Sequence, residues 1–110
     1  MTTVTFFTEG QRITGFQAEG HSGYVAEGED IVCAAVTSSV RLVECVLNDV
    51  MGLCASVKVQ DKNARITLRL PGSLGPAAEE TCQTLLAGLM VHFSELHSEY
   101  PGNIEVMEAQ

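Results

Sequence analysis

Two long segments of the chain carry apolar side chains at the three- and four-residue spacing of a helix, over about residues 31–50 and 76–99. The first stripe consists of Val32, Ala35, Val36, Val40, Val43, Val46, Leu47 and Val50, and the second of Cys82, Leu85, Leu86, Leu89, Phe93 and Leu96. A helix with one apolar face must pack that face against another element, so the rest of the chain has to provide a shared surface.

Five shorter segments have the residue types or the alternation of β-strands. The expected strands cover residues 4–8, 12–18, 53–59, 64–70 and 104–107. Short turns join the first strand to the second and the third to the fourth, which is typical of hairpins. The resulting order ββαββαβ predicts a single α+β domain over residues 1–110, in which two helices cover a mostly antiparallel sheet.

The charge balance narrows the classes of partner. Six Lys and Arg residues stand against fourteen Asp and Glu residues, so the formal net charge of the 110-residue chain is -8. Nucleic-acid binding needs a basic face, and single-strand binding also uses aromatic stacking, but the chain has no Trp and only 5% aromatic residues. The composition therefore predicts no direct nucleic-acid contact, and it suits a basic protein partner.

The first residues, Met-Thr-Thr-Val-Thr, lack the basic lead and the long apolar stretch of a secretory signal. The longest apolar run, residues 85–91, is far too short to span a membrane. We therefore expect a cytoplasmic protein that makes no membrane contact.

The four cysteines are expected to be free thiols, because the cytoplasm is reducing. Cys45, Cys54 and Cys82 are expected to be core or half-buried residues. The cysteine and histidine spacings match no compact zinc pattern, so the sequence predicts neither a metal nor another cofactor.

A possible reactive pair lies around the start of the first helix. Cys33 is expected near the third helical position if Asp30 is the N-cap, and free amides there favour a thiolate. His21 follows the second expected strand and would be the base that takes the thiol proton and returns it to a leaving amine. The same pattern also fits a structural cysteine and an unrelated histidine, because nearness in sequence does not show nearness in space.

Residues 20–29 contain three glycines, Gly20, Gly23 and Gly28, and are expected to form a mobile loop that gates this pair. On the helix, Thr37 follows Cys33 by one turn on the face opposite the valines, so its hydroxyl is expected near the thiol. This face is expected to be accessible, which favours a reactive Cys33 over a core residue.

The residues Gly20 and His21, the glycine-containing loop, and the run GEDIVCAAV at 28–36 resemble the ribosomal-processing cysteine proteases of the Prp family. Chain length and element order fit the same family over essentially the whole chain. The resemblance implies a cysteine endopeptidase that removes the short N-terminal extension of large-subunit ribosomal protein twenty-seven, which supports ribosome assembly. It further implies a homodimer and a mobile loop between the histidine and the cysteine.

Carried over residue by residue, the resemblance implies that Cys33 is the nucleophile and His21 the general base and acid. Asp30 matches a position that supports the site, and Thr37 stands where the family often has Ser. Two other functions remain open: a non-catalytic acidic adaptor that binds a basic ribosomal protein, and a thiol redox or acyl-transfer enzyme. The absence of a C-x-x-C motif counts against dithiol exchange.

Overall fold

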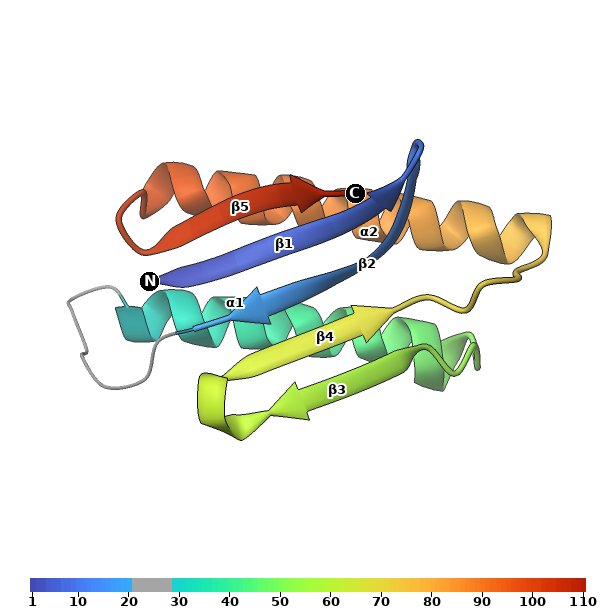
Figure 1. Cartoon of the computed structure of the whole chain (residues 1–110), viewed down its shortest axis with the longest axis horizontal. Helices are drawn as coiled ribbons and strands as arrows, with labels where there is room; N and C mark the ends of the chain where they lie inside the picture. The colour runs from blue at the N-terminus through green and yellow to red at the C-terminus, as the bar shows by residue number, and fades with distance from the viewer. Residues whose placement is uncertain (21–28) are drawn as a thin grey trace.

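The computed structural model describes residues 1–20 and 29–110, which form one five-stranded sheet with two helices on the same face (Figure 1). The sheet has the strand order β3-β4-β2-β1-β5. Its strands are β1 (Thr2–Glu9), β2 (Arg12–Glu19), β3 (Ser56–Gln60), β4 (Arg65–Arg69) and β5 (Ile104–Ala109). Three neighbouring pairs are antiparallel and β1–β5 is parallel, so the predicted α+β class, element order and mostly antiparallel sheet are confirmed.

The core lies between the sheet and the helices α1 (Glu29–Glu44) and α2 (Pro76–Glu99). Phe6 of β1 is its centre: the ring centroids of Phe16 and Phe93 lie 5.8 Å and 6.3 Å from that of Phe6, and all three side chains are fully buried. Burying one such side chain stabilises the fold by about 1.5–3 kcal/mol. The packing of α2 follows its predicted stripe, since Cys82, Leu86, Leu89, Phe93 and Leu96 are buried.

The first helix differs from the prediction at both ends. It begins at Glu29, so Asp30 lies inside its first turn and is not the N-cap; carboxylates there are stabilised by the positive end of the helix dipole. The α-helix ends at Glu44, and residues Cys45–Val50 continue as a π-helical segment, η1. The widened turn rotates the end of the stripe out of the core, and Val50 is 75% exposed.

The third strand begins at Ser56, three residues later than predicted. Cys54 has a left-handed backbone, with φ of 57°, which an extended strand cannot continue through. The Asn48 carboxamide holds this turn: its Oδ1 accepts from the Ala55 amide at 2.6 Å, and its Nδ2 donates to the Ala55 carbonyl at 3.2 Å.

The expectation for the remaining cysteines was wrong in two cases. Cys45 in η1 and Cys54 in the left-handed turn are both exposed, whereas Cys82 of α2 is buried. Both exposed cysteines lie in the irregular connection between α1 and β3, whose backbone the alternation of the sequence does not reveal.

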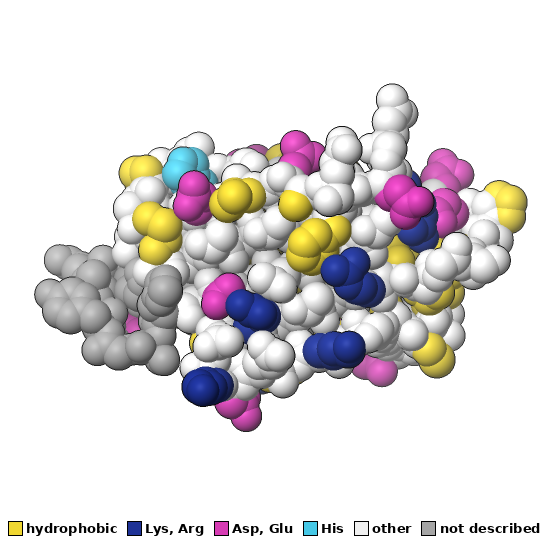
Figure 2. Space-filling model, in the orientation of Figure 1, with side chains coloured by type: hydrophobic (Ala, Val, Ile, Leu, Met, Phe, Trp, Pro, Cys, Tyr) yellow, Lys and Arg dark blue, Asp and Glu magenta, His cyan; other side chains and the backbone are white. Residues whose placement is uncertain are grey.

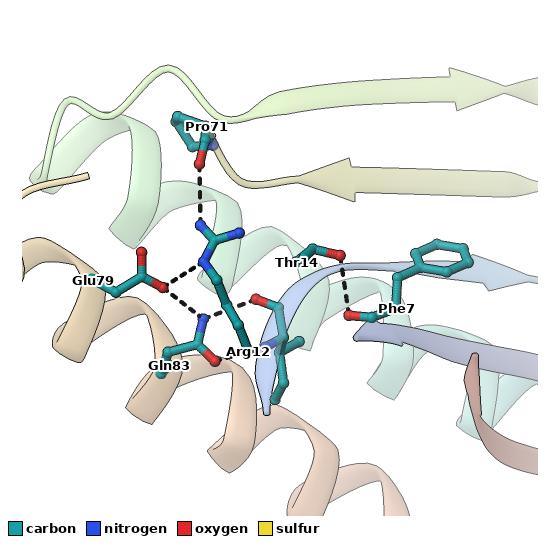
Figure 3. A network of polar contacts seen from close by, with 7 residues as sticks. Phe7, Arg12, Thr14, Pro71, Glu79 and Gln83 are labelled. Carbon is teal, nitrogen blue, oxygen red and sulfur yellow. Dashed lines mark hydrogen bonds and ion pairs between the residues drawn. The ribbon is translucent and has the colours of Figure 1, made fainter. Parts of the chain in front are cut away.

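Close strand contact explains one glycine in β2. An ideal Cβ on Gly15 would lie 2.2 Å from the Leu68 carbonyl oxygen and 3.0 Å from the Cα of Arg69. A side chain at this position would force β4 away from β2. The register opposite β1 also shifts here, between Phe7 and Thr8, and the Thr14 hydroxyl donates to the Phe7 carbonyl at 3.2 Å (Figure 3).

A polar network joins the start of α2 to the start of β2 (Figure 3). The guanidinium of Arg12 donates from Nε to Glu79 at 2.7 Å and from an Nη to the Pro71 carbonyl at 3.1 Å. The carboxamide of Gln83 accepts from the Ile13 amide and donates to the Ile13 carbonyl, both at 2.8 Å. Gln83 therefore satisfies both backbone groups of Ile13, as a neighbouring strand would.

The sheet face away from the helices carries a concentration of cations in an acidic chain. Figure 2 shows Lys and Arg side chains gathered over β3 and β4. Lys58, Arg65 and Arg69 line a hollow there. Arg65 also pairs with Glu19, and Arg69 lies over the Phe7 ring at 4.6 Å from its centroid. Within the described ranges, no helix is long and apolar enough to cross a membrane.

Candidate active site

Four elements meet at one end of the sheet and enclose a small pocket. Because β1 and β2 are antiparallel, the start of β1 lies beside the end of β2, and Thr3 pairs with Glu19. The beginning of α1 covers this edge from the helix side, and the beginning of β4 adjoins the end of β2. The pocket has a volume of about 120 Å³ and is lined by Thr2, Ala18, Glu19, Gly20, Cys33, Val36, Thr37, Ala64 and Ile66.

Cys33 places its thiol in this pocket. It is the fifth residue of α1, not the third as expected, because the helix begins earlier. Its thiol is half-buried, and the sulfur lies 3.7 Å from the Thr2 hydroxyl oxygen. Cys33 and Thr37 also line an open depression on the outer side of α1, together with Ala34, Ser38 and Arg41. The thiol is therefore accessible, as the position of its helical face indicated.

The two residues expected to support the site occupy different positions. Thr37 is exposed, lies one turn after Cys33, and lines both hollows that contain the thiol. Asp30 is exposed in the first turn of α1 and is not among the described residues that line either hollow. The structure thus brings Thr37 and Cys33 to one surface and leaves Asp30 at its margin.

The predicted base, His21, and two of the three glycines of the predicted loop, Gly23 and Gly28, lie outside the described residues. Gly20 is described and adjoins the thiol: an ideal Cβ on Gly20 would lie 3.7 Å from the Thr2 hydroxyl oxygen and 4.0 Å from the Cys33 sulfur.

One acidic and one basic side chain, Glu19 and Arg41, line the hollows that contain the thiol. Glu19 lines the pocket, but its carboxylate accepts two hydrogen bonds of 3.2 Å from the Arg65 guanidinium. Arg41 lines the outer depression. The buried thiol of Cys82 lies outside this pocket, and burial raises its pKa, Glu79 raises it further, and Arg12 opposes the shift. Cys82 is therefore held as a neutral thiol within the core.

The sequence did not single out Thr2, Ala64 or Ile66 as pocket residues. Thr2 did carry a signal, because it shares the alternating face of β1 with Val4 and Phe6, which places a hydroxyl among buried apolar side chains. Ala64 and Ile66 carried none, since their place depends on the pairing of β4 with β2. Among the described residues, no group of three or more His, Cys, Asp or Glu side chains is arranged to hold a metal ion.

Comparisons with known proteins agree with this arrangement. Residues 1–105 match the family model described as cysteine protease Prp. The ribosomal processing cysteine protease Prp of Bacillus subtilis (strain 168) is 27% identical over 94 residues, which cover 86% of this chain and 84% of that protein.

Two solved structures share the fold. The ribosomal processing protease Prp of S. aureus, in complex with a substrate peptide, has a TM-score of 0.84 at 18% identity, with 99% of this chain and 100% of that chain covered. SMU.848 from Streptococcus mutans has a TM-score of 0.82 at 19% identity, with 98% of this chain and 93% of that chain covered.

The family model and the curated relative define the chain as a cysteine protease, and the accessible thiol in a pocket at a helix start agrees with that class. The family match extends over nearly the whole length, from residue 1 to residue 105. The chain belongs to the cysteine protease Prp family.

Proposed function

We propose that this protease removes the short N-terminal extension of large-subunit ribosomal protein twenty-seven in the cytoplasm, with Cys33 as nucleophile and His21 as general base and acid. The observation that carries the proposal is the Cys33 thiol, half-buried and accessible in a pocket at the start of α1. The curated B. subtilis relative is named for ribosomal processing, and an S. aureus relative was solved with a substrate peptide.

The proposed reaction has two steps. The Cys33 sulfur attacks the carbonyl carbon of the scissile peptide bond, His21 takes the thiol proton, and the same proton passes to the departing amine as the C–N bond breaks. Water then hydrolyses the thioester and regenerates the thiol. Backbone amides at the start of α1 stabilise the negative charge that develops on the carbonyl oxygen in each step. Asp30 in that first turn and the Thr37 hydroxyl are proposed to support the site.

The pocket and the overall charge suit such a substrate. Ala18, Val36 and Ile66 give the pocket an apolar wall, which favours an apolar side chain of the substrate beside the scissile bond. A ribosomal protein segment is basic because it lies against RNA, and the net charge of -8 attracts such a segment. The protease acts on a basic ribosomal protein precursor and, in this proposal, makes no direct contact with nucleic acid or membrane.

The test is to incubate the precursor with the wild type and with the variants Cys33→Ala and His21→Ala, and to read the fragment masses. Both variants should fold normally and leave the precursor intact, whereas Cys54→Ala, which removes an exposed thiol, should cleave as the wild type does. Cleavage by Cys33→Ala would refute the assignment of the nucleophile. Binding of the precursor by the wild type without cleavage would favour the non-catalytic adaptor instead.

We also propose a homodimer, as the resemblance to the family implies. An apolar groove of about 480 Å³ runs between α1 and α2, where it is lined by Leu42, Leu85, Gly88 and Leu89 among others. Leu42 is 63% exposed, and homodimer interfaces bury apolar surface of this kind. Sedimentation equilibrium should give a dimer mass at the concentrations used for cleavage, and a monomer mass there would contradict this proposal.

A further inference from the structure

One polar residue lies in the apolar layer beneath the candidate site. Thr2 is 3% exposed and is the buried polar residue among the described parts of the chain. It occupies the helix-facing side of β1, where the next two inward residues, Val4 and Phe6, are fully buried. A hydroxyl that is almost entirely shielded from solvent needs a hydrogen-bond partner within the protein.

The sulfur of Cys33 is that partner. The distance between the Thr2 oxygen and the Cys33 sulfur is 3.7 Å, and either group can donate while the thiol is protonated. A thiolate can only accept, so the Thr2 hydroxyl must donate once Cys33 has lost its proton. A hydrogen bond to an ionised acceptor is stronger than one between neutral groups, so this contact favours the thiolate.

The backbone holds the hydroxyl in place. The Thr2 amide donates to the Asn103 carbonyl at 2.9 Å, and Thr2 pairs with Ile104 of β5 in the parallel ladder. Threonine is branched at Cβ, which restricts its side-chain rotation in a strand. Gly20 completes the cluster, since its Cα is close enough that an added Cβ would contact both the hydroxyl and the sulfur.

We propose that Thr2 is a positioning residue of this protease: its hydroxyl donates to the Cys33 thiolate, fixes the sulfur toward the pocket and stabilises its charge. The inference rests on the proposed role of Cys33 as nucleophile. Among the described residues, the charged side chains that line the two hollows are Glu19 of β2 and Arg41 of α1, and substitution of Thr2 leaves both unchanged.

The test compares Thr2→Val, which keeps the shape and removes the hydroxyl, with Thr2→Ser, which keeps the hydroxyl. Two rates are measured: cleavage of the precursor and alkylation of Cys33 by iodoacetamide, located by peptide mass. Thr2→Val should lower kcat and slow alkylation by about tenfold at unchanged KM, as expected for a lost hydrogen bond to a charged group. Thr2→Ser should restore most of both rates. Thr5→Val, on the opposite face of β1, is the matched control and should behave as the wild type.

The outcomes separate this inference from the proposed function. Wild-type rates in Thr2→Val would overturn the hydrogen bond while leaving the protease assignment intact. Equal losses in Thr2→Val and Thr2→Ser, with lowered melting temperatures, would show that Thr2 only fills space and would also overturn it. If the wild type itself does not cleave the precursor, the proposed function fails, and the alkylation rates alone then decide whether Thr2 activates the thiol.

Discussion

The contact between Gln83 and Ile13 gives a quantitative prediction about how α2 is attached to the sheet. The Gln83 carboxamide makes two hydrogen bonds of 2.8 Å with the backbone of Ile13, a residue that is 8% exposed (Figure 3). Its Nε2 also donates to Glu79 at 3.2 Å. Truncation by Gln83→Ala removes all three bonds and leaves the Ile13 amide and carbonyl without their side-chain partner.

The magnitude follows from those two backbone groups. An unsatisfied buried donor or acceptor costs about 1–3 kcal/mol, and part of this cost is recovered where water can bond to the group in place of the half-buried Gln83 side chain. We therefore expect Gln83→Ala to lower the free energy of unfolding by about 2–4 kcal/mol. For a domain of this length, that corresponds to a fall in melting temperature of roughly 8–16 °C.

The assay is urea unfolding followed by far-ultraviolet circular dichroism, with a thermal melt of the same variants. Glu95→Ala is the matched control, because Glu95 is an exposed residue of α2 away from the groove, and its truncation should change stability by less than about 0.5 kcal/mol. Ile13 lies at the start of β2, whereas the pocket that contains Cys33 lies at the end of β2, so Gln83→Ala should still cleave well below its melting temperature. A decrease in the free energy of unfolding below about 1 kcal/mol, comparable to that of the control, would refute the conclusion that Gln83 satisfies the Ile13 backbone in place of a neighbouring strand.

Two further predictions concern the thiols and their surroundings. Burial raises the pKa of Cys82 in the folded state, so the contribution of the neutral thiol to stability is complete below the unfolded thiol pKa of about 8.5 and is lost as the pH rises through the folded pKa. The free energy of unfolding, measured across this pH range, should therefore decline less steeply for Cys82→Ala than for the wild type. An identical slope would contradict the pKa shift. Gly20→Ala places a methyl group at ordinary contact distance from the Thr2 oxygen and the Cys33 sulfur. The variant should fold normally, and iodoacetamide should label its Cys33 more slowly than that of the wild type. Unchanged labelling would show that the reagent reaches the thiol from the outer side of α1 instead.

The sequence predicted best the elements whose contacts repeat along the chain. The stripe of α2 is long and regular, and its bounds and buried residues agree with the prediction. The start of β3 was mispredicted because the alternation from Leu53 continues through Cys54, whose left-handed backbone is set by the bond between Asn48 and Ala55. No local pattern encodes such a contact.

The candidate site shows the same division. The position of Cys33 on an accessible face of α1 could be inferred from helical spacing alone. The walls of its pocket could not, because Thr2, Cys33 and Ala64 come together only through the pairing of strands that are far apart in sequence. A helical wheel shows which way a side chain faces, but it cannot show which strand lies opposite.

The parallel pairing of β1 with β5 links the first strand of the chain to the last. Every other strand pair joins segments that are closer in sequence, so the β1–β5 ladder is the contact with the greatest loop to close during folding. The Thr2 amide depends on the carbonyl of Asn103, just before β5. During synthesis, the hydrogen bond that holds the Thr2 backbone beside Cys33 therefore cannot form before residue 103 has emerged, and the pairing of β1 with β5 needs residues 104–109 as well.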